Sequence, residues 1–444
     1  MGSTPPASHQ LHDCYGRAYR VGPSAELLTG HPRGAQLAFA AVAMAAAGVL
    51  QYGFGALVPS LSDLHGWSGT ATLWLLAVWT AAQALVGLPV ARLRERGTAG
   101  PVPLVVLGGF CCLLAPAALG RTPGYLGALL GFSVLGGTGA GLVYAVATST
   151  AAKWFPDRSA VRVSLATGAF AWGAVPFTAL AVPMATPDTV RVLLDSTAVL
   201  SACLVIAAGL LLRDPPPRWW PPHVDPRVWA LRRSRGALPA VRDHSPGQAV
   251  RAGAPLLAAV LCCASAVTLF TVATFVPFAR DLGLGVPVLT TAAVLLVAAN
   301  GAARAVVLRV SERIGRTRTL GAALTVLALS QLCLAVGGGS ANAAPLLAGA
   351  VLAGAGGACY PLVASVVRDY FGDTRHAEIH ALVYSAKAVG GLVGIGVGAT
   401  LAPTWGYPVL FLVTSLLALV SAGLSRGLRQ PGRMVPPWTT QRVR

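Results

Sequence analysis

Charged residues are scarce in this chain of 444 residues. They make up 11% of the sequence, whereas soluble domains carry about 25%. Apolar residues make up 55%, and the mean hydropathy is +0.66. So few charges exclude a water-exposed globule. Apolar stretches of about twenty residues recur along the chain, and each can cross a hydrocarbon core about 30 Å thick. The sequence therefore predicts a membrane protein that crosses the bilayer many times.

Acidic residues are the scarcer charge, with 15 Asp and Glu against 33 Lys and Arg. None lies deep inside an apolar stretch. Asp195, Asp281, Asp369 and Glu378 come closest, and each is near an end or in a loop. A transporter of cationic drugs would normally need a carboxylate within the membrane. Its absence disfavours that class of substrate.

The patterns of a metal site or an enzyme are also missing. The 8 cysteines, Cys111 and Cys262 among them, mostly lie in apolar stretches without ligand spacing, and we interpret them as packing residues. All 8 histidines, including His376 and His380, are expected in tails or loops. No nucleophile–base pair lies within the apolar stretches. We therefore expect no metal, no cofactor and no enzymatic activity.

Twelve apolar stretches are long enough to be membrane helices. A polar segment without signal-peptide features precedes the first, so we interpret all of them as permanent spans. The predicted spans are 36–60, 69–91, 101–120, 123–151, 162–184, 190–212, 253–279, 287–309, 319–337, 343–368, 379–400 and 407–425.

Basic residues gather in alternate loops, around Arg92, Lys153, Arg313 and Arg375, while the other loops hold little beyond residues such as Arg280. Loops rich in arginine and lysine face the cytoplasm. Both termini fall on that side, which predicts a multi-pass protein of the cell membrane. The net charge of +18 arises mostly from these loops. Anionic lipids of the cytoplasmic face, and not nucleic acid, are the expected partner. We expect a monomer.

Residues 213–252 interrupt the apolar pattern with a run rich in proline and arginine. We predict a linker on the cytoplasmic leaflet without a fold of its own, with Trp219 and Trp220 at the level of the headgroups. The predicted organisation is a tail 1–35, a six-helix bundle 36–212, the linker 213–252, a second six-helix bundle 253–425 and a tail 426–444.

The two predicted bundles resemble each other at a nearly constant offset of 216 or 217 positions. The matched pairs are Gln83 with Asn300, Glu95-Arg96 with Glu312-Arg313, Tyr144 with Tyr360, and Trp154-Phe155-Pro156-Asp157 with Tyr370-Phe371-Gly372-Asp373. Four matches indicate a duplicated six-helix unit. Such duplication is typical of transporters, whose substrate site lies near the bilayer midplane between the repeats. The predicted fold is an all-α membrane protein of twelve helices in two pseudo-symmetric halves.

With this architecture, the loops RLRERG (92–97) and SERIGRTR (311–318) resemble the loop motif of the major facilitator superfamily. Four further segments resemble the oxalate/formate antiporter family: QYGFGALVPSL (51–61), KWFPDR (153–158), RDPPPRWWPP (213–222) and YFGDTRHAEIHALVYSAKAVGGLVG (370–394). The resemblance implies that Arg304, seven residues before Ser311, and Lys387, in the YxxK segment, bind the substrate. It also implies gating roles for the loop residues Arg92, Arg96, Glu312, Arg313, Gly315 and Arg316.

Lys387 and Arg304 also stand out by position alone. Lys387 lies about nine residues, or some 13 Å, inside its span, and a charge near the bilayer centre costs roughly 2.5–3.5 kcal/mol on insertion scales. A structural lysine bonded to backbone carbonyls and an arginine that reaches the headgroups are the alternatives. With no acidic residue inside any span, however, the two cations have no anion to neutralise them. A small carboxylate substrate would supply the missing charge.

Polar and aromatic residues are expected around the two cations. The candidates for this wall are Gln51, Tyr52, Gln83, Tyr144, Asn300, Tyr360 and Tyr384. Tyr384 and Lys387 are three residues apart and share a helical face. The glycine runs 136–141 and 354–357 lie inside spans without a preceding strand, so they predict close helix packing and not a phosphate loop.

The sequence thus predicts a secondary transporter that moves a small mono- or dicarboxylate by alternating access, with exchange as the expected mode. Two alternatives stay open. One is an exporter of drugs or metabolites from the same superfamily, and the other is a proton-coupled importer of monocarboxylates.

Overall fold

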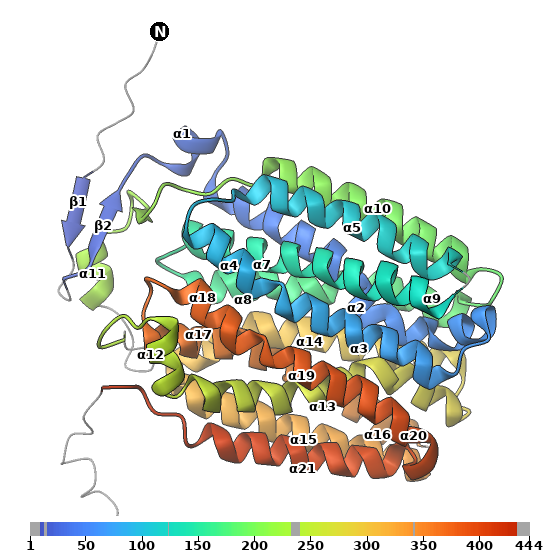
Figure 1. Cartoon of the computed structure of the whole chain (residues 1–444). Coiled ribbons are helices and arrows are strands. Elements are labelled where there is room, and N and C mark those ends of the chain that lie inside the picture. Colours follow the sequence, from blue (N-terminus) through green and yellow to red (C-terminus); the bar gives the residue numbers. More distant parts are fainter. Residues whose placement is uncertain (1–8, 13–15, 123, 232–239, 341, 433–444) are drawn as a thin grey trace, which may run out of the picture.

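The computed structural model describes residues 9–12, 16–122, 124–231, 240–340 and 342–432. Among these residues, 12 helical segments are long and apolar enough to cross a membrane (Figure 1). Each overlaps one predicted span, so the prediction of twelve membrane helices is confirmed. Most segments run past the predicted ends, because polar residues continue a helix beyond the hydrocarbon core. The first, for example, is Arg33–His65, where the sequence predicted 36–60.

The first six crossing segments are formed by α2 (Arg33–His65), α3 (Gly69–Leu85), α4 (Gly87–Glu95), α5 (Pro101–Arg121), α6 (Tyr125–Ala128), the π-helix η1 (Leu129–Gly136), α7 (Gly137–Trp154), α8 (Ser159–Trp172), α9 (Ala174–Met184) and α10 (Val190–Leu211). The last six are formed by α13 (Ala254–Asp281), α14 (Val286–Ile314), α15 (Arg316–Ser340), α16 (Ala343–Ala353), the 3₁₀-helix η2 (Gly354–Ala358), α17 (Cys359–Phe371), α18 (His376–Tyr384), α19 (Ala386–Gly391), the π-helix η3 (Leu392–Val397), α20 (Gly398–Trp405) and α21 (Tyr407–Ser425).

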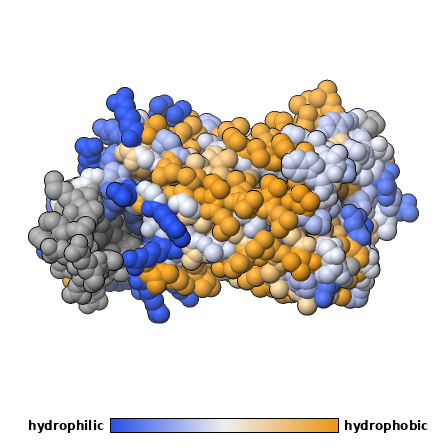
Figure 2. Space-filling view, turned by 90° about the horizontal axis from the view of Figure 1, so that it is seen from below, coloured by the Kyte–Doolittle hydropathy of each residue, from blue (hydrophilic) through white to orange (hydrophobic). Residues whose placement is uncertain are grey.

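The helices α2 to α10 lie above α13 to α21 in Figure 1, and the two sets meet along α2, α3, α8, α13, α14 and α19. On the face shown in Figure 2, an apolar band covers the middle of the molecule, and hydrophilic residues lie towards both ends. We call the end that carries the arginine-rich loops the basic end. The domain boundaries at 36, 213, 253 and 426 remain predictions.

The glycine runs allow helices to pack closely, as predicted. A Cβ atom on Gly141 would lie 2.2 Å from Val86, and one on Gly357 would lie 2.4 Å from the carbonyl oxygen of Asn300. Both approaches are too close for any larger residue. They bring α7 against α3, and η2 against α14 beside Arg304. The glycines therefore help to position the helices that carry the candidate site.

The predicted linker is partly folded, which corrects the sequence prediction. Its β3 (Trp219–Trp220) pairs parallel with β2 (Ala18–Val21), which pairs antiparallel with β1 (His9–His12). The short helices α1 (Ala25–Thr29), α11 (Pro226–Leu231) and α12 (Pro246–Arg251) lie at the same basic end. Residues 1–8, 232–239 and 433–444 of the predicted tails and linker lie outside the described residues.

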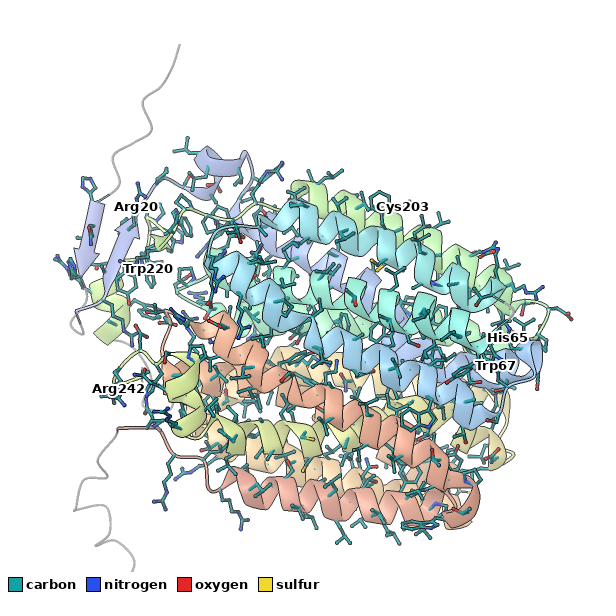
Figure 3. All side chains as sticks on the ribbon, viewed as in Figure 1. Arg20, His65, Trp67, Cys203, Trp220 and Arg242 are labelled. Carbon is teal, nitrogen blue, oxygen red and sulfur yellow. The ribbon has the colours of Figure 1, made fainter. Side chains whose placement is uncertain are left out.

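The placement of Trp219 and Trp220 at the lipid headgroups is wrong. They are only 4% and 1% exposed, and their partners are protein. The ring of Trp219 lies 5.0 Å from that of Trp154, and the ring of Trp220 lies 4.6 Å from that of Tyr19. Figure 3 shows Trp220 beside the strands at the basic end. The tryptophans therefore anchor the start of the linker to the protein.

Asp214 holds three membrane helices together at the basic end, just after α10. Its carboxylate accepts hydrogen bonds from Arg94 at 3.0 Å, Thr150 at 2.8 Å and Lys153 at 2.6 Å. Burial disfavours the charged form of Asp214, yet Arg94 and Lys153 outweigh it, and the pKa of the carboxyl group is lowered. The Arg94 side chain is only 2% exposed, so Asp214, and not water, stabilises its charge.

We expect Asp214→Asn to lower the free energy of unfolding by roughly 1–3 kcal/mol, because it leaves the buried Arg94 guanidinium without a countercharge. A lowered pKa in the folded state means that this contribution is complete above the unfolded pKa of about 3.9 and is lost as the pH falls below it. Thermal unfolding in detergent at pH 7 measures the effect. Asp188→Asn, at an exposed carboxylate without an ion-pair partner among the described residues, is the matched control. An unchanged melting temperature in Asp214→Asn would contradict the assignment.

Candidate functional site

Lys387 lies in α19 and is only 2% exposed. Its Nζ donates hydrogen bonds to Gln83 Oε1 at 2.7 Å, to Gln51 Oε1 at 3.3 Å and to Tyr384 Oη at 3.3 Å. An ammonium group has three protons, so these three neutral oxygens satisfy its hydrogen bonds without neutralising its charge. The two glutamines belong to α2 and α3, which places Lys387 at the contact between the two sets of helices.

Arg304 lies in α14 and is likewise 2% exposed. Its Nε donates to Asn300 Oδ1 at 3.3 Å, its Nη1 donates to the carbonyl oxygen of Thr167 at 3.1 Å, and its Nη2 donates to Tyr52 Oη. Tyr52 and Thr167 belong to α2 and α8. Arg304 therefore also takes partners from across the contact between the two sets, and every partner is neutral.

Tyr360 joins the two cations. Its ring centroid lies 4.8 Å from the guanidinium carbon of Arg304 and 5.5 Å from Nζ of Lys387. Such contacts stabilise a cation but do not cancel its charge. Two buried amide donors, Gln51 Nε2 and Asn300 Nδ2, also have no hydrogen-bond partner among the described residues. Two cations and two unpaired N–H donors form a site suited to an oxygen anion.

The predicted repeat is reflected in the contacts of the two cations. Gln83 and Asn300 occupy matching positions in the two halves of the sequence, 217 residues apart. Gln83 accepts a hydrogen bond from Lys387, and Asn300 accepts one from Arg304. The positions that match the two cations are Gly87 for Arg304 and Ala171 for Lys387, so the charge pair belongs to the C-terminal half alone.

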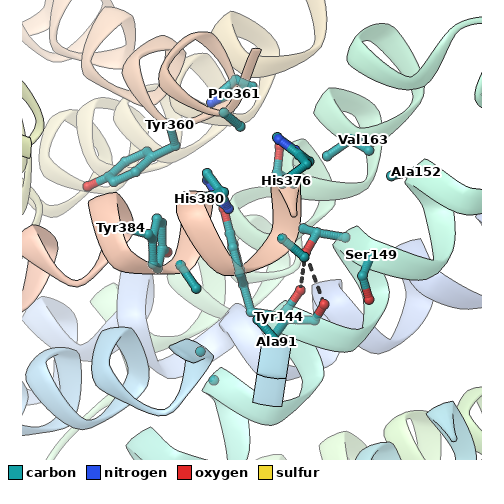
Figure 4. A pocket seen from close by; sticks show the side chains of 18 of the residues that line it. Ala91, Tyr144, Ser149, Ala152, Val163, Tyr360, Pro361, His376, His380 and Tyr384 are labelled. Carbon is teal, nitrogen blue, oxygen red and sulfur yellow. Dashed lines mark hydrogen bonds between the residues drawn. The ribbon is translucent and has the colours of Figure 1, made fainter. Parts of the chain in front are cut away.

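An aromatic pair separates the cations from a cavity. Tyr144 of α7 stacks on Tyr384 of α18, with ring centroids 5.1 Å apart and planes 20° apart. These tyrosines, with Gln83 and Tyr360, line the inner end of a cavity of about 800 Å³, open solvent included (Figure 4). Its outer end is lined by Arg94, Ser149, Ala152, Val163 and His376. We call this cavity the vestibule, and it leads from the basic end to the tyrosine pair.

At the other end of the molecule, hydrogen bonds join the two sets of helices. Trp74 Nε1 donates to Thr400 Oγ1 at 3.1 Å, which ties α3 to α20. Arg280 Nη2 donates to the carbonyl oxygen of Val182 at 3.1 Å, which ties α13 to α9. Figure 3 shows His65 and Trp67 at this same end. The two sets of helices are therefore joined at the end opposite the vestibule.

Some of the predicted gating residues make contacts across the basic end. Arg92 pairs with Glu378 of α18 at 2.9 Å, and Glu95 Oε1 accepts a hydrogen bond from the backbone N–H of Glu378 at 3.0 Å. These contacts join α4 to α18, the helix that carries Tyr384. Within the second motif, Arg316 pairs with Asp369 at 3.3 Å.

The remaining predicted gating residues make fewer contacts across the basic end. Gly315 has φ +99°, a backbone conformation that favours glycine, at the turn between α14 and α15. Arg96, Glu312 and Arg313 have no ion-pair partner among the described residues. The gating roles of all six residues remain predictions.

The structure brings together every residue that the sequence proposed for the substrate site. These residues are Gln51, Tyr52, Gln83, Tyr144, Asn300, Arg304, Tyr360, Tyr384 and Lys387. Their binding of a substrate remains a prediction.

Sequence reasoning missed Thr167, which contributes only a backbone carbonyl, and the two vestibule histidines. His376 and His380 lie in helix α18, and not in a loop as predicted, and both line the vestibule. The spacing of His376, His380 and Tyr384, four residues apart, could have revealed a common helical face. In the part of the chain that the structure describes, no cluster of His, Cys, Asp or Glu could hold a metal ion.

Comparison with known proteins identifies the family. The Major Facilitator Superfamily model matches residues 40–308 and 256–439, which together span most of the chain. The chain belongs to this superfamily. It is therefore a multi-pass membrane transporter and not an enzyme, as the sequence predicted.

A curated relative refines this assignment. The chain is 26% identical over 333 residues to a protein named oxalate:formate antiporter from Oxalobacter formigenes. The matched region covers 73% of this chain and 75% of the relative. This similarity confirms the resemblance to the oxalate/formate antiporter family.

Proposed function

We propose that this transporter moves a small organic anion, a mono- or dicarboxylate, across the cell membrane by alternating access. The observation that carries the proposal is the pair of buried cations, Arg304 and Lys387, which share Tyr360 and have only neutral partners. Among the described residues, no Asp or Glu lies deep in a membrane helix. An anionic substrate neutralises both charges in a region where isolated charges are costly. The name of the relative supports a carboxylate.

The orientation and mode are part of the proposal. The basic end faces the cytoplasm, because arginine-rich loops favour that side, and the first and last described residues lie at that end. Exchange is the favoured mode, since moving two unneutralised cations through the low-dielectric midplane is costly without an anion. We expect radiolabelled oxalate loaded into proteoliposomes to leave at least several-fold faster when unlabelled carboxylate is present outside. Equal efflux with and without external anion would show that exchange is wrong.

A ligand screen tests the substrate class independently of transport. A ligand that binds only the folded protein raises its melting temperature, by an amount that grows with the ratio of concentration to Kd. We expect mono- or dicarboxylates to stabilise the purified protein, and neutral drugs of similar size to leave it unchanged. Stabilisation by neutral drugs alone would favour an exporter of the same superfamily. Uptake of a monocarboxylate that needs a proton gradient and no counter-anion would favour the proton-coupled importer.

A further inference from the structure

The vestibule is lined by two imidazoles and one guanidinium, and by no carboxylate among the described residues. Apart from tyrosines, its titratable lining residues are Arg94, His376 and His380. The rest of its wall is mostly small, with Ala145 and Ala381 on facing helices. This leaves room for a small ligand on the basic-end side of the tyrosine pair, outside the site formed by the two membrane cations.

The two histidines lie one after the other along α18, next to the tyrosine pair. They lie four residues apart on α18, with ring centroids 5.9 Å apart and planes 23° apart. The His380 ring lies 5.6 Å from the ring of Tyr384, whose hydroxyl contacts Lys387. Figure 4 shows both imidazoles on the cavity side of the helix. A ligand that passes from the basic end to Lys387 therefore meets both imidazoles first.

Donors in the vestibule lack partners. Among the described residues, Nη1 of Arg94 and Nδ1 of His376 are buried and have no hydrogen-bond partner. The first is a donor, and the second donates when the imidazole proton is on Nδ1. His380 makes no hydrogen bond to any described residue. Buried polar atoms are normally paired, and an unpaired one costs free energy. These groups therefore have capacity left for an acceptor.

The carboxylates near the vestibule already have hydrogen-bond or ion-pair partners. Glu378 pairs with Arg92 and lies 3.7 Å from Arg375, while Glu95 accepts a backbone N–H of α18. Neither carboxylate lines the vestibule. Asp214 holds one side of the Arg94 guanidinium and leaves Nη1 unpaired. No carboxylate in the wall of the vestibule competes with or repels an incoming anion.

We propose that the vestibule contains a second anion-binding site, in which His376, His380 and Arg94 hold a small carboxylate before it passes the tyrosine pair. The proposal rests on the function proposed above. A carboxylate accepts hydrogen bonds from several donors at once, and the vestibule offers imidazole and guanidinium groups that have no partner among the described residues. Binding there raises the concentration of the anion next to the Tyr144–Tyr384 pair. The second site is weaker than the first, because Asp214 already balances the charge of Arg94.

Equilibrium binding of radiolabelled oxalate to the purified full-length protein tests the second site. We expect two classes of binding in the wild-type protein. Lys387→Ala severely weakens the tighter class and leaves the affinity of the weaker class unchanged. Adding His376→Ala and His380→Ala to Lys387→Ala lowers the affinity of the weaker class about ten-fold or more, as expected for lost hydrogen bonds to a charged group. His31→Ala, which removes an exposed histidine outside the vestibule, is the matched control.

The outcomes separate the two proposals. The vestibule site is overturned if Lys387→Ala shows no saturable binding of oxalate. It is also overturned if the affinity of the weaker class is the same with and without the two histidine changes. Tight binding that survives Lys387→Ala overturns the proposed function and leaves the vestibule site to be judged by the histidine variants. If the alanine variants melt at a lower temperature than Lys387→Ala, the pair His376→Gln and His380→Gln replaces them. Glutamine keeps a donor, so this pair should lose less affinity than the alanine pair, and equal losses in both pairs also contradict a donor role.

Discussion

Lys387→Ala should reduce carboxylate uptake to the background of empty proteoliposomes while leaving the protein folded. The ammonium group is 2% exposed and contacts only neutral oxygens. Its removal therefore takes away half of the charge that attracts an anion, and it also relieves the cost of a buried charge. Uptake of radiolabelled oxalate, measured at matched protein levels, gives the activity. Thermal unfolding of the same preparation gives the stability, which we expect to be unchanged or increased.

The other lysine in the sequence provides the matched control. Lys153 pairs with Asp214 at the basic end, and its side chain is 41% exposed. An exposed ion pair contributes little to the free energy of unfolding. Lys153→Ala should retain uptake. Lys387→Arg should restore only part of it, because the planar guanidinium does not reproduce three bonds to Gln51, Gln83 and Tyr384 from one compact centre. Full uptake by Lys387→Ala would falsify the anion site and return this lysine to a structural role.

The membrane helices and both cations could be predicted because their physical causes are local. Twenty apolar residues suffice for a span, and a charge inside such a run is conspicuous. The pairing of residues around the cations could not be predicted. Gln51 and Tyr52 are adjacent in the sequence, yet Gln51 contacts Lys387 and Tyr52 contacts Arg304. Which neighbour faces which cation depends on how α2 packs against α14 and α19.

The errors at the basic end have a common cause. Hydropathy marks the hydrocarbon core and not the ends of helices, so the predicted span began at 379, although α18 begins at His376. His376 was therefore assigned to a loop, and His380, the second residue of the predicted span, was assigned there with it. Trp219 was assigned to the lipid headgroups for a similar reason, since a proline-rich polar segment gives no local indication of a fold. Its partners, Trp154 and the backbone of Pro23, are distant in the sequence.

Arg304 and Lys387 should behave as one site when both are changed. Each contacts the ring of Tyr360, and the anion must meet both charges at once. Arg304→Ala alone should therefore reduce uptake as severely as Lys387→Ala. Arg304→Lys should recover little, because a single ammonium cannot bond Tyr52, Thr167 and Asn300 with the spread of a guanidinium.

The double variant then distinguishes one shared site from two separate roles. Residues that act on the same substrate are not additive, so Arg304→Ala combined with Lys387→Ala should reduce the affinity for oxalate little more than either single change. Direct binding to the purified protein measures this, because transport of the single variants falls below detection. Arg309→Ala combined with Lys387→Ala is the matched control, since Arg309 is exposed at the basic end of the same helix α14. If the losses of the two single changes simply add in the double variant, the cations bind independently. A single anion held between Arg304 and Lys387 would then be excluded.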